Sequence, residues 1–282
     1  MASTVAPQPG PSPSKDVQWF LPEITEVNPA FRVVMEDYSK IPPEEVKSHI
    51  LNIREKAWQT FPYPCIGQFS FLTLSVASHA CYPRVLSTLS TPGSKATLLD
   101  LGCCLAQDIR KLVSDGALAD NLHACDLEYG FIELGYELFA DRDVLKSHFF
   151  AADIFDERGR LSETEGIFDF IHVGSFLHLF TQEDQIRACK RIVKLMKPYE
   201  GSTVFGRQMG NLKATAVPNF LQGGTMWQHD PRSFEHMWQV VGEETGTRWD
   251  VRTELDSAEG MNQRHWSSEG CRRLKFEVTR LS

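Results

Sequence analysis

Residues 97–108 read TLLDLGCCLAQD, a short apolar run that ends in an acid and a single glycine before a helical stretch begins. These letters predict a β-strand, a tight turn at Gly102 and a helix, and glycine allows a ligand to approach the turn closely because it has no Cβ. A dinucleotide-binding loop would read G-x-G-x-x-G, whereas Cys104 and Ala106 follow Gly102 here. The turn therefore argues against a dinucleotide as the ligand.

The composition favours a protein that binds a small molecule. The 282 residues are 42% hydrophobic, with a formal charge of −8 and scattered Lys and Arg, which argues against a nucleic-acid partner. No run approaches the roughly 18 apolar residues of a membrane span, so none is expected. Seven cysteines without a CxxC pair predict reduced thiols and a cytoplasmic location. A homodimer is kept open, and no metal site is predicted because the chain lacks HExxH and histidine pairs at ligand spacing.

The chain divides by composition into three parts. Residues 1–16 alternate proline with small and polar residues, which predicts a disordered leader. Residues 17–95 are rich in aromatic residues and broken by prolines, which favours short helices and turns that form an N-terminal helical cap. Residues 96–282 form the expected core, with a substrate-lining insertion near residues 208–232.

From Ala96 onward, short apolar strands alternate with helical stretches, which is typical of repeated βα units and a mainly parallel sheet. The expected strands cover residues 97–101, 122–126, 148–153, 168–173, 202–207 and 273–280. The last of them alternates apolar and polar residues, which predicts an antiparallel edge strand with one wet face. Helices are expected over residues 182–196, capped by Thr181, and from Ser233 to Gly246.

Acids lie at or beside the ends of three successive strands, at Asp100, Asp126 and Asp153. In open α/β sheets the carboxyl ends of the strands share one crevice, so we expect these side chains to converge on one ligand. The interval between Gly102 and Asp126 suits a carboxylate that binds a ribose diol. Asp153 is placed to meet an adenine amino group, with the apolar residue Ile154 beside the ring. The combination predicts an adenosine without phosphates.

These residues resemble the class I S-adenosylmethionine-dependent methyltransferases. The motifs that carry the resemblance are LLDLGCCLAQD, ACDLE, AADIFD and FDFIHVGSFLHLF, in that order, over residues 97–210. The segments WFLPEITEVNP, FPYPCIGQFSFL, FGRQMG and WQHDPRSFEHMWQVVGEETGTRW are similar to the fungal methyltransferases of meroterpenoid biosynthesis. The resemblance implies a Rossmann-like α/β fold, with a mostly parallel sheet, an antiparallel last strand and helices on both faces. It also implies S-adenosylmethionine as the cofactor.

The resemblance implies a cofactor site and a substrate site. Asp100 and Gly102 would lie near the methionine moiety, Asp126 and Leu127 at the ribose, and Asp153 with Ile154 at the adenine. The full expected cofactor set is Tyr63, Asp100, Gly102, Cys103, Asp126, Leu127, Ala152, Asp153, Ile154, Gly174 and Ser175. The expected substrate set is Phe20, Arg207, Trp227 and His229, where Arg207 offers a planar fork for an anionic group.

The expected reaction is O-methylation of the carboxyl group of a prenylated aromatic, polyketide-derived acid. An ionised carboxylate needs no base at pH 7, because its pKa is near 4. A phenol or alcohol acceptor is the first alternative, and it would need a base such as His178. A nucleotide-cofactor oxidoreductase is another, and a relative that binds the cofactor without transferring a methyl group is a third.

Overall fold

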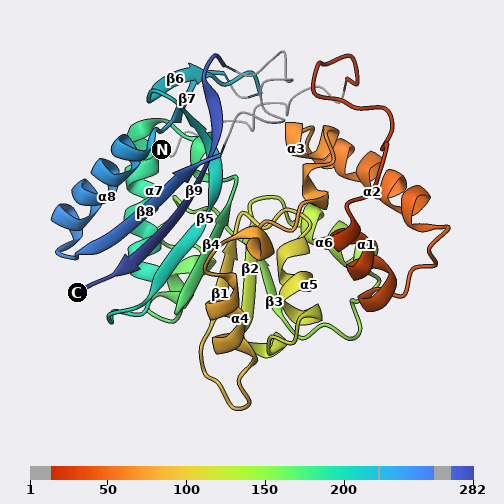
Figure 1. Ribbon diagram of the computed structural model, residues 1–282, viewed down its shortest axis with the longest axis horizontal. Helices are drawn as coiled ribbons and strands as arrows, with labels where there is room; N and C mark the ends of the chain where they lie inside the picture. The colour runs from red at the N-terminus through yellow and green to blue at the C-terminus, as the bar shows by residue number, and fades with distance from the viewer. Residues whose placement is uncertain (1–13, 222, 257–267) are drawn as a thin grey trace, which may run out of the picture.

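A computed structural model describes residues 14–221, 223–256 and 268–282 of the chain. Its centre is a seven-stranded sheet in the order β3-β2-β1-β4-β5-β9-β8 (Figure 1). The strands are β1 (Leu98–Leu101), β2 (Leu122–Asp126), β3 (His148–Ala151), β4 (Phe170–Gly174), β5 (Thr203–Asn211), β8 (Trp249–Leu255) and β9 (Cys271–Arg280). The first five run parallel, which confirms the mainly parallel sheet.

The last strand is antiparallel, as predicted, but its place in the sheet was predicted wrongly. β9 pairs with β5 on one side and with β8 on the other, both antiparallel, so it is an interior strand. Its Leu274, Phe276 and Val278 are buried, while the alternating polar residues are only partly covered. The edge is β8, a strand that was not among those expected.

Helices cover both faces of the sheet, as Figure 1 shows. One face carries α7 (Gln182–Leu195) and α8 (Pro231–Thr245), and the other carries α4 (Tyr82–Ser90), α5 (Gln107–Ser114) and α6 (Tyr129–Phe139). The connections contain the 3₁₀ turns η4 (Ala119–Asn121), η5 (Arg160–Thr164) and η6 (Leu177–Leu179). The arrangement is the Rossmann-like fold with helices on both faces that the sequence predicted.

Two helix starts test the predicted caps. The Thr181 hydroxyl accepts a hydrogen bond from the amide of Asp184 at 3.2 Å and caps α7 as expected. Helix α8 begins two residues earlier than predicted. Its N-cap is Asp230, and Ser233 is the third helical residue of a reciprocal capping box. The predicted end at Gly246 is confirmed, where the backbone turns left-handed.

The N-terminal part of the described chain contains helices and turns and no strand up to β1. Its elements are α1 (Pro29–Val33), the π-helix η1 (Val34–Tyr38), α2 (Val46–Thr60), α3 (Pro64–Gly67), η2 (Ser70–Leu72) and η3 (Val76–Ser78). α1 and α2 pack on α6 around Phe31, Trp58 and Phe139. Tyr38 donates a hydrogen bond to Asp141, which also forms a buried ion pair with Arg110 at 2.9 Å. The expected leader falls outside the described residues up to residue 13.

A separate two-stranded sheet lies above the main sheet. It is a hairpin of β6 (Thr215–Pro218) and β7 (Thr225–Gln228), within the region where an insertion was expected. The amide of Trp227 donates to the carbonyl of Phe180 at 2.9 Å, so β7 is fastened beside η6. The hairpin therefore overhangs the carboxyl ends of the parallel strands (Figure 1).

Candidate functional site

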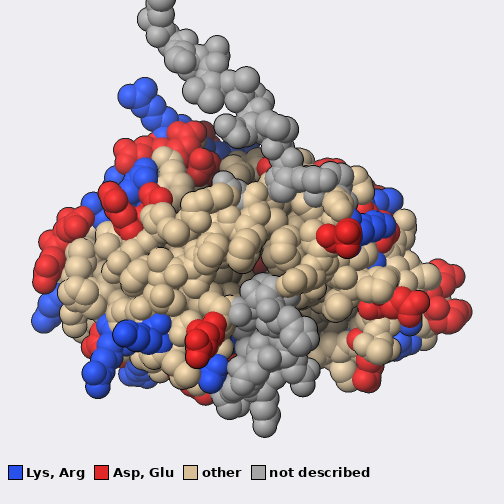
Figure 2. Space-filling model, turned by 90° about the horizontal axis from the view of Figure 1, so that it is seen from above, with Lys and Arg blue, Asp and Glu red and all other residues tan. Residues whose placement is uncertain are grey.

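The carboxyl ends of the parallel strands β1, β2 and β3, which carry or precede Asp100, Asp126 and Asp153, lie at the upper edge of the sheet. Figure 2 views this edge from above and shows uncharged residues over its centre, with charged side chains gathered toward the rim. Gly102 has a φ of +74°, and a Cβ there would lie 2.6 Å from the ring of Phe176. Glycine is therefore required at this turn both by its conformation and by the close approach of Phe176.

The loop after Gly102 keeps a glycine-like backbone without glycines. Cys104 has a φ of +53° and Ala106 a φ of +51°, both in the left-handed region. That region costs an L-residue about 1–2 kcal/mol. The Cys103 amide donates to the Cys125 carbonyl at 3.0 Å, and the Cys104 amide donates to Asp126 at 2.8 Å. Both amides thus hold the turn against β2.

Asp100 is tied to a buried cluster behind the loop. Its Oδ1 lies 2.7 Å from Nδ1 of His172 on the neighbouring strand β4. Ser75 lies 3.3 Å from the other ring nitrogen of His172 and donates a hydrogen bond to Asp108 at 2.8 Å. Burial alone would lower the pKa of His172, but the charge and hydrogen bond of Asp100 raise it overall. The second oxygen of Asp100 is buried and has no hydrogen-bond partner among the described residues.

Asp126 is positioned by two backbone amides. One oxygen accepts from the Cys104 amide at 2.8 Å and the other from the Glu128 amide at 3.1 Å. Burial raises the pKa of Asp126 to about 6, although both hydrogen bonds oppose this shift. Burial and then the charge of Asp126 raise the pKa of the Tyr63 phenol in the N-terminal part of the chain. Tyr63 therefore lies near enough to Asp126 for that charge to act on it.

The remaining cofactor candidates lie along the same edge with different exposure. Leu127 is 59% exposed, whereas Ile154 is 3% exposed and packs in the core beneath the edge. The Ala152 amide donates to the carbonyl of Asp126 at 2.9 Å. Asp153 is exposed and one of its oxygens caps the Phe155 amide at 2.9 Å. Ile154 therefore offers little surface to an adenine.

The turn after β4 is held to β5. Ser175 has a φ of +58°, and its amide donates to the Arg207 carbonyl at 2.6 Å. A Cβ on Gly174 would lie 3.0 Å from the ring of His172. Gly174 therefore faces the cluster that holds Asp100, whereas Ser175 is held to β5.

Two histidines at the edge are poor proton acceptors. Burial lowers the pKa of both His178 and His229 to about 4. One ring nitrogen of His229 lies 2.9 Å from the Ser233 hydroxyl. The other ring nitrogen of His229 and Nδ1 of His178 are buried without a hydrogen-bond partner among the described residues. Both imidazoles are neutral at pH 7.

The other predicted substrate residues are placed apart. Trp227 lies on β7 with its ring centroid 6.2 Å from that of His229. Arg207 is 9% exposed on β5 and lies near enough to His172 for its charge to act on that ring's pKa. Phe20 packs in the N-terminal part, 4.9 Å from the ring of Trp58 and 4.3 Å from the guanidinium of Arg54. The four residues do not form one cluster.

An apolar hollow joins the N-terminal part to the hairpin. Its volume is about 170 Å³, and its walls are Ser14, Val17, Trp19, Trp58, Pro62, Phe220 and Leu221. Phe220 and Leu221 belong to the turn between β6 and β7, whereas the other walls come from residues before Tyr63. Phe20, which was expected at the substrate, is not a wall of the hollow, whereas its neighbour Trp19 is, and only the fold shows which ring faces the hollow.

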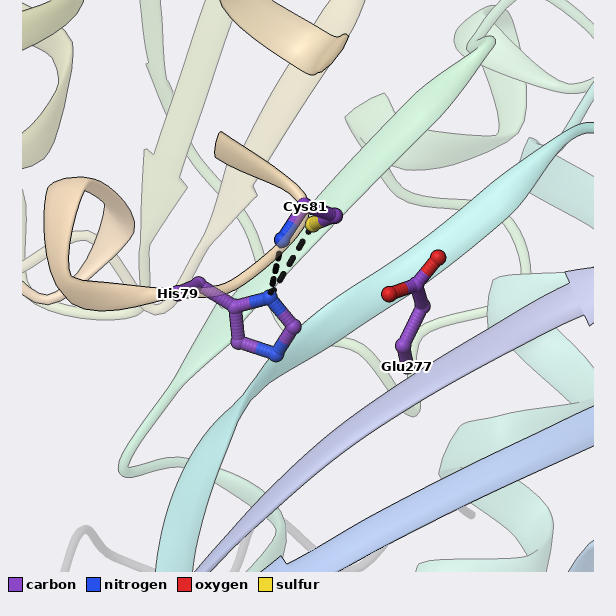
Figure 3. Close-up of side chains that lie close together, drawn as sticks. All are labelled: His79, Cys81 and Glu277. Atoms are coloured by element: carbon purple, nitrogen blue, oxygen red, sulfur yellow. Dashed lines mark hydrogen bonds between the residues drawn. The ribbon is translucent and has the colours of Figure 1, made fainter. Parts of the chain in front are cut away.

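Two groups of three potential metal ligands occur in the described residues. One is Asp100, Asp108 and His172, and the other is His79, Cys81 and Glu277. Figure 3 shows the second group, in which the thiol of Cys81 lies 3.0 Å from one ring nitrogen of His79. The other ring nitrogen lies 3.0 Å from the Phe276 carbonyl, and Glu277 pairs with Arg84. These contacts fasten the segment before α4 to β9.

Comparisons with known proteins agree with this geometry. Residues 98–199 match a family described as a methyltransferase domain, and residues 19–72 match a meroterpenoid methyltransferase N-terminal domain. The chain is 46% identical over 270 residues to the O-methyltransferase atr3 of Stereocaulon alpinum, covering 95% of this chain and 77% of that protein. The chain belongs to this family of fungal S-adenosylmethionine-dependent methyltransferases.

Two further relatives match most of this chain. The O-methyltransferase phiE of a fungal species is 40% identical, covering 93% of this chain and 92% of phiE. The asnovolin E/chermesin D methyltransferase nvfJ of Aspergillus novofumigatus is 36% identical, covering 81% and 82%. A structure of a Burkholderia thailandensis methyltransferase with S-adenosylhomocysteine has a TM-score of 0.49 and 14% identity, covering 73% of this chain and 80% of that one.

The family membership decides the class of enzyme. The protein is a methyltransferase of fungal secondary metabolism that uses S-adenosylmethionine, and the oxidoreductase alternative is set aside. The residues fit that cofactor, because Asp100 offers an unpartnered buried oxygen at the end of β1 and the Asp126 carboxylate stands at the end of β2. Among the described residues, no helix is long and apolar enough to cross a membrane.

Proposed function

We propose that the enzyme transfers a methyl group to the carboxyl group of a hydrophobic, prenylated aromatic acid. The observation that carries the proposal is the pKa of about 4 of His178 and His229, the two histidines beside the overhanging hairpin. A phenol has a pKa near 10, so proton transfer to such an imidazole is uphill by about 8 kcal/mol. A carboxylic acid is already ionised at pH 7 and needs no base.

The mechanism then rests on positioning. S-adenosylmethionine supplies a methyl group on a sulfonium that leaves as a neutral thioether. Asp100 and Gly102 would hold the methionine end, and Asp126 would accept hydrogen bonds from the ribose. The turn with Phe176 and the β6–β7 hairpin would exclude water and hold the acceptor oxygen in line with the methyl group.

The apolar part of the substrate fits the hollow between Trp19 and Phe220. Its volume of about 170 Å³ is similar to the roughly 150 Å³ of an engineered apolar cavity that binds benzene. It thus suits one ring or one isoprene unit rather than a whole terpenoid.

A matched pair of acceptors tests the proposal. The enzyme is incubated with S-adenosylmethionine and either 4-hydroxy-3-prenylbenzoic acid or its carboxamide, which keeps the phenol and loses the acid. We expect methylation of the acid alone. Equal methylation of the carboxamide would instead support the phenol alternative, in which a histidine acts as base.

A further inference from the structure

The side chain of Gln208 on β5 has no structural partner. It is 2% exposed, and both its amide oxygen and its amide nitrogen are buried without a hydrogen-bond partner among the described residues. Burying such a group unpaired costs about 1–3 kcal/mol. Native structures contain few groups of this kind, and each calls for an explanation. Gln208 was not among the residues expected from the sequence.

Further unpartnered buried polar atoms lie on β7, on the residue that follows it and on η6, the segments next to the end of β5. They are the indole nitrogen of Trp227, one ring nitrogen of His229 and one of His178. Side chains alternate along a strand, so Gln208 and Gly210 share one face of β5. A Cβ on Gly210 would lie 2.7 Å from the His229 carbonyl, which places the end of β7 over that face. β7 is in turn fastened to the η6 segment that carries His178.

This group of atoms carries no positive charge. Gln208 and Trp227 offer neutral N–H donors, and the two histidines are neutral at pH 7 because burial lowers their pKa to about 4. The strand alternation directs Arg207 to the opposite face of β5, whereas Arg272 of β9, which pairs with Gly210, lies on the face of Gln208 and donates a hydrogen bond to the Cys271 carbonyl at 2.8 Å. Gln208 and Trp227 themselves would offer an anionic oxygen hydrogen bonds from neutral groups.

Neutral donors suit a carboxylate that is the nucleophile. The carboxylate loses its charge as the methyl group is transferred, so a guanidinium ion pair would stabilise the starting state more than the transition state. Neutral amide and indole N–H groups would orient the oxygen and stabilise the charged starting state less than a guanidinium would.

We propose that Gln208 and Trp227 form a subsite that binds the acceptor carboxyl group of the substrate. The inference rests on the proposed function, and it assigns substrate recognition to hydrogen bonding by neutral groups rather than to Arg207. The unpartnered atoms of the free enzyme find their partners in the oxygens of the bound acid.

Three variants test the subsite: Gln208→Leu removes the amide at similar volume, Trp227→Phe removes the N–H, and Gln239→Leu is a control on the exposed face of α8. We expect Gln208→Leu to lower kcat/KM for 4-hydroxy-3-prenylbenzoic acid by about 10- to 100-fold, mostly through KM. Calorimetric affinity for S-adenosylmethionine is expected to stay unchanged. The Tm is expected to hold or rise, since an unsatisfied buried amide is removed.

The outcomes separate the two proposals. A lower Tm with full activity in Gln208→Leu would show that the amide is structural and would overturn the subsite. Unchanged KM in both Gln208→Leu and Trp227→Phe would overturn it as well. If the wild-type enzyme binds S-adenosylmethionine but methylates the carboxamide as well as the acid, carboxyl methylation itself is contradicted, whatever the variants show.

Discussion

Nδ1 of His172 lies 2.7 Å from Oδ1 of Asp100, and both side chains are buried on adjacent parallel strands. The contact leaves the second Asp100 oxygen unpartnered beside Gly102. His172 is therefore the residue that orients the Asp100 carboxylate, a candidate contact of the cofactor.

Removing the imidazole therefore affects both stability and cofactor binding. Removing one partner of a buried hydrogen bond costs about 1–3 kcal/mol, so His172→Leu is expected to lower the Tm by several degrees. His172→Gln keeps a donor toward Asp100 and is expected to recover most of that loss. Thermal unfolding and calorimetry with S-adenosylmethionine measure the two effects, and a His172→Leu variant with wild-type affinity would contradict the role of His172.

Asp126 makes cofactor binding sensitive to pH. Its pKa of about 6 means that the carboxylate is ionised above that pH and is progressively protonated below it. Because a protonated carboxyl group accepts hydrogen bonds from a ribose more weakly, affinity for S-adenosylmethionine is expected to fall as the pH drops through 6. Asp126→Asn should remove this dependence and weaken binding at pH 8. An equal pH dependence in wild type and Asp126→Asn would count against Asp126 as its source.

Cys104 and Ala106 have left-handed backbones, so we expect a glycine in this loop to cost less stability than a glycine in a helix. Ala106→Gly relieves a left-handed backbone that costs about 1 kcal/mol, which offsets the usual penalty of glycine. Ala188 lies inside α7 at normal helical geometry, so Ala188→Gly is expected to cost about 1 kcal/mol. Urea unfolding compares the two, and equal destabilisation would contradict the strain at Ala106.

The apolar hollow predicts a substitution that affects the substrate alone. Phe220→Ser removes one wall of the hollow, so KM for the prenylated acid is expected to rise about tenfold while affinity for S-adenosylmethionine holds. Leu212→Ser is the control, because Leu212 is 61% exposed and lies just before the same hairpin. Loss of cofactor affinity in Phe220→Ser would place the hollow in the cofactor site instead.

Much of the fold could be predicted because its signals are local. Apolar runs that end in Asp100 and Asp126 marked parallel strands, and the capping residue Thr181 marked a helix. Strand β8 was missed because Asp250, Arg252 and Glu254 make it read as a loop, although alternate residues are apolar. Its presence also moved β9 from the edge to the interior.

The site was less predictable than the fold because it depends on long-range contacts. Cys104 has a left-handed backbone although it is not a glycine, so its residue type gives no sign of this conformation, which the surrounding turn imposes. The isolation of Gln208 arises only when the hairpin closes over β5. Trp19 and Phe20 are adjacent in sequence, and the packing of α2 determines which of the two faces the hollow.

The central claim is that a carboxyl oxygen accepts the methyl group. The most direct measurement is mass spectrometry of the product formed from 4-hydroxy-3-prenylbenzoic acid, before and after mild alkaline hydrolysis. The account predicts a gain of one methyl group that alkali removes, because a methyl ester is cleaved. A methyl group that survives alkali would be an aryl ether and would contradict the account.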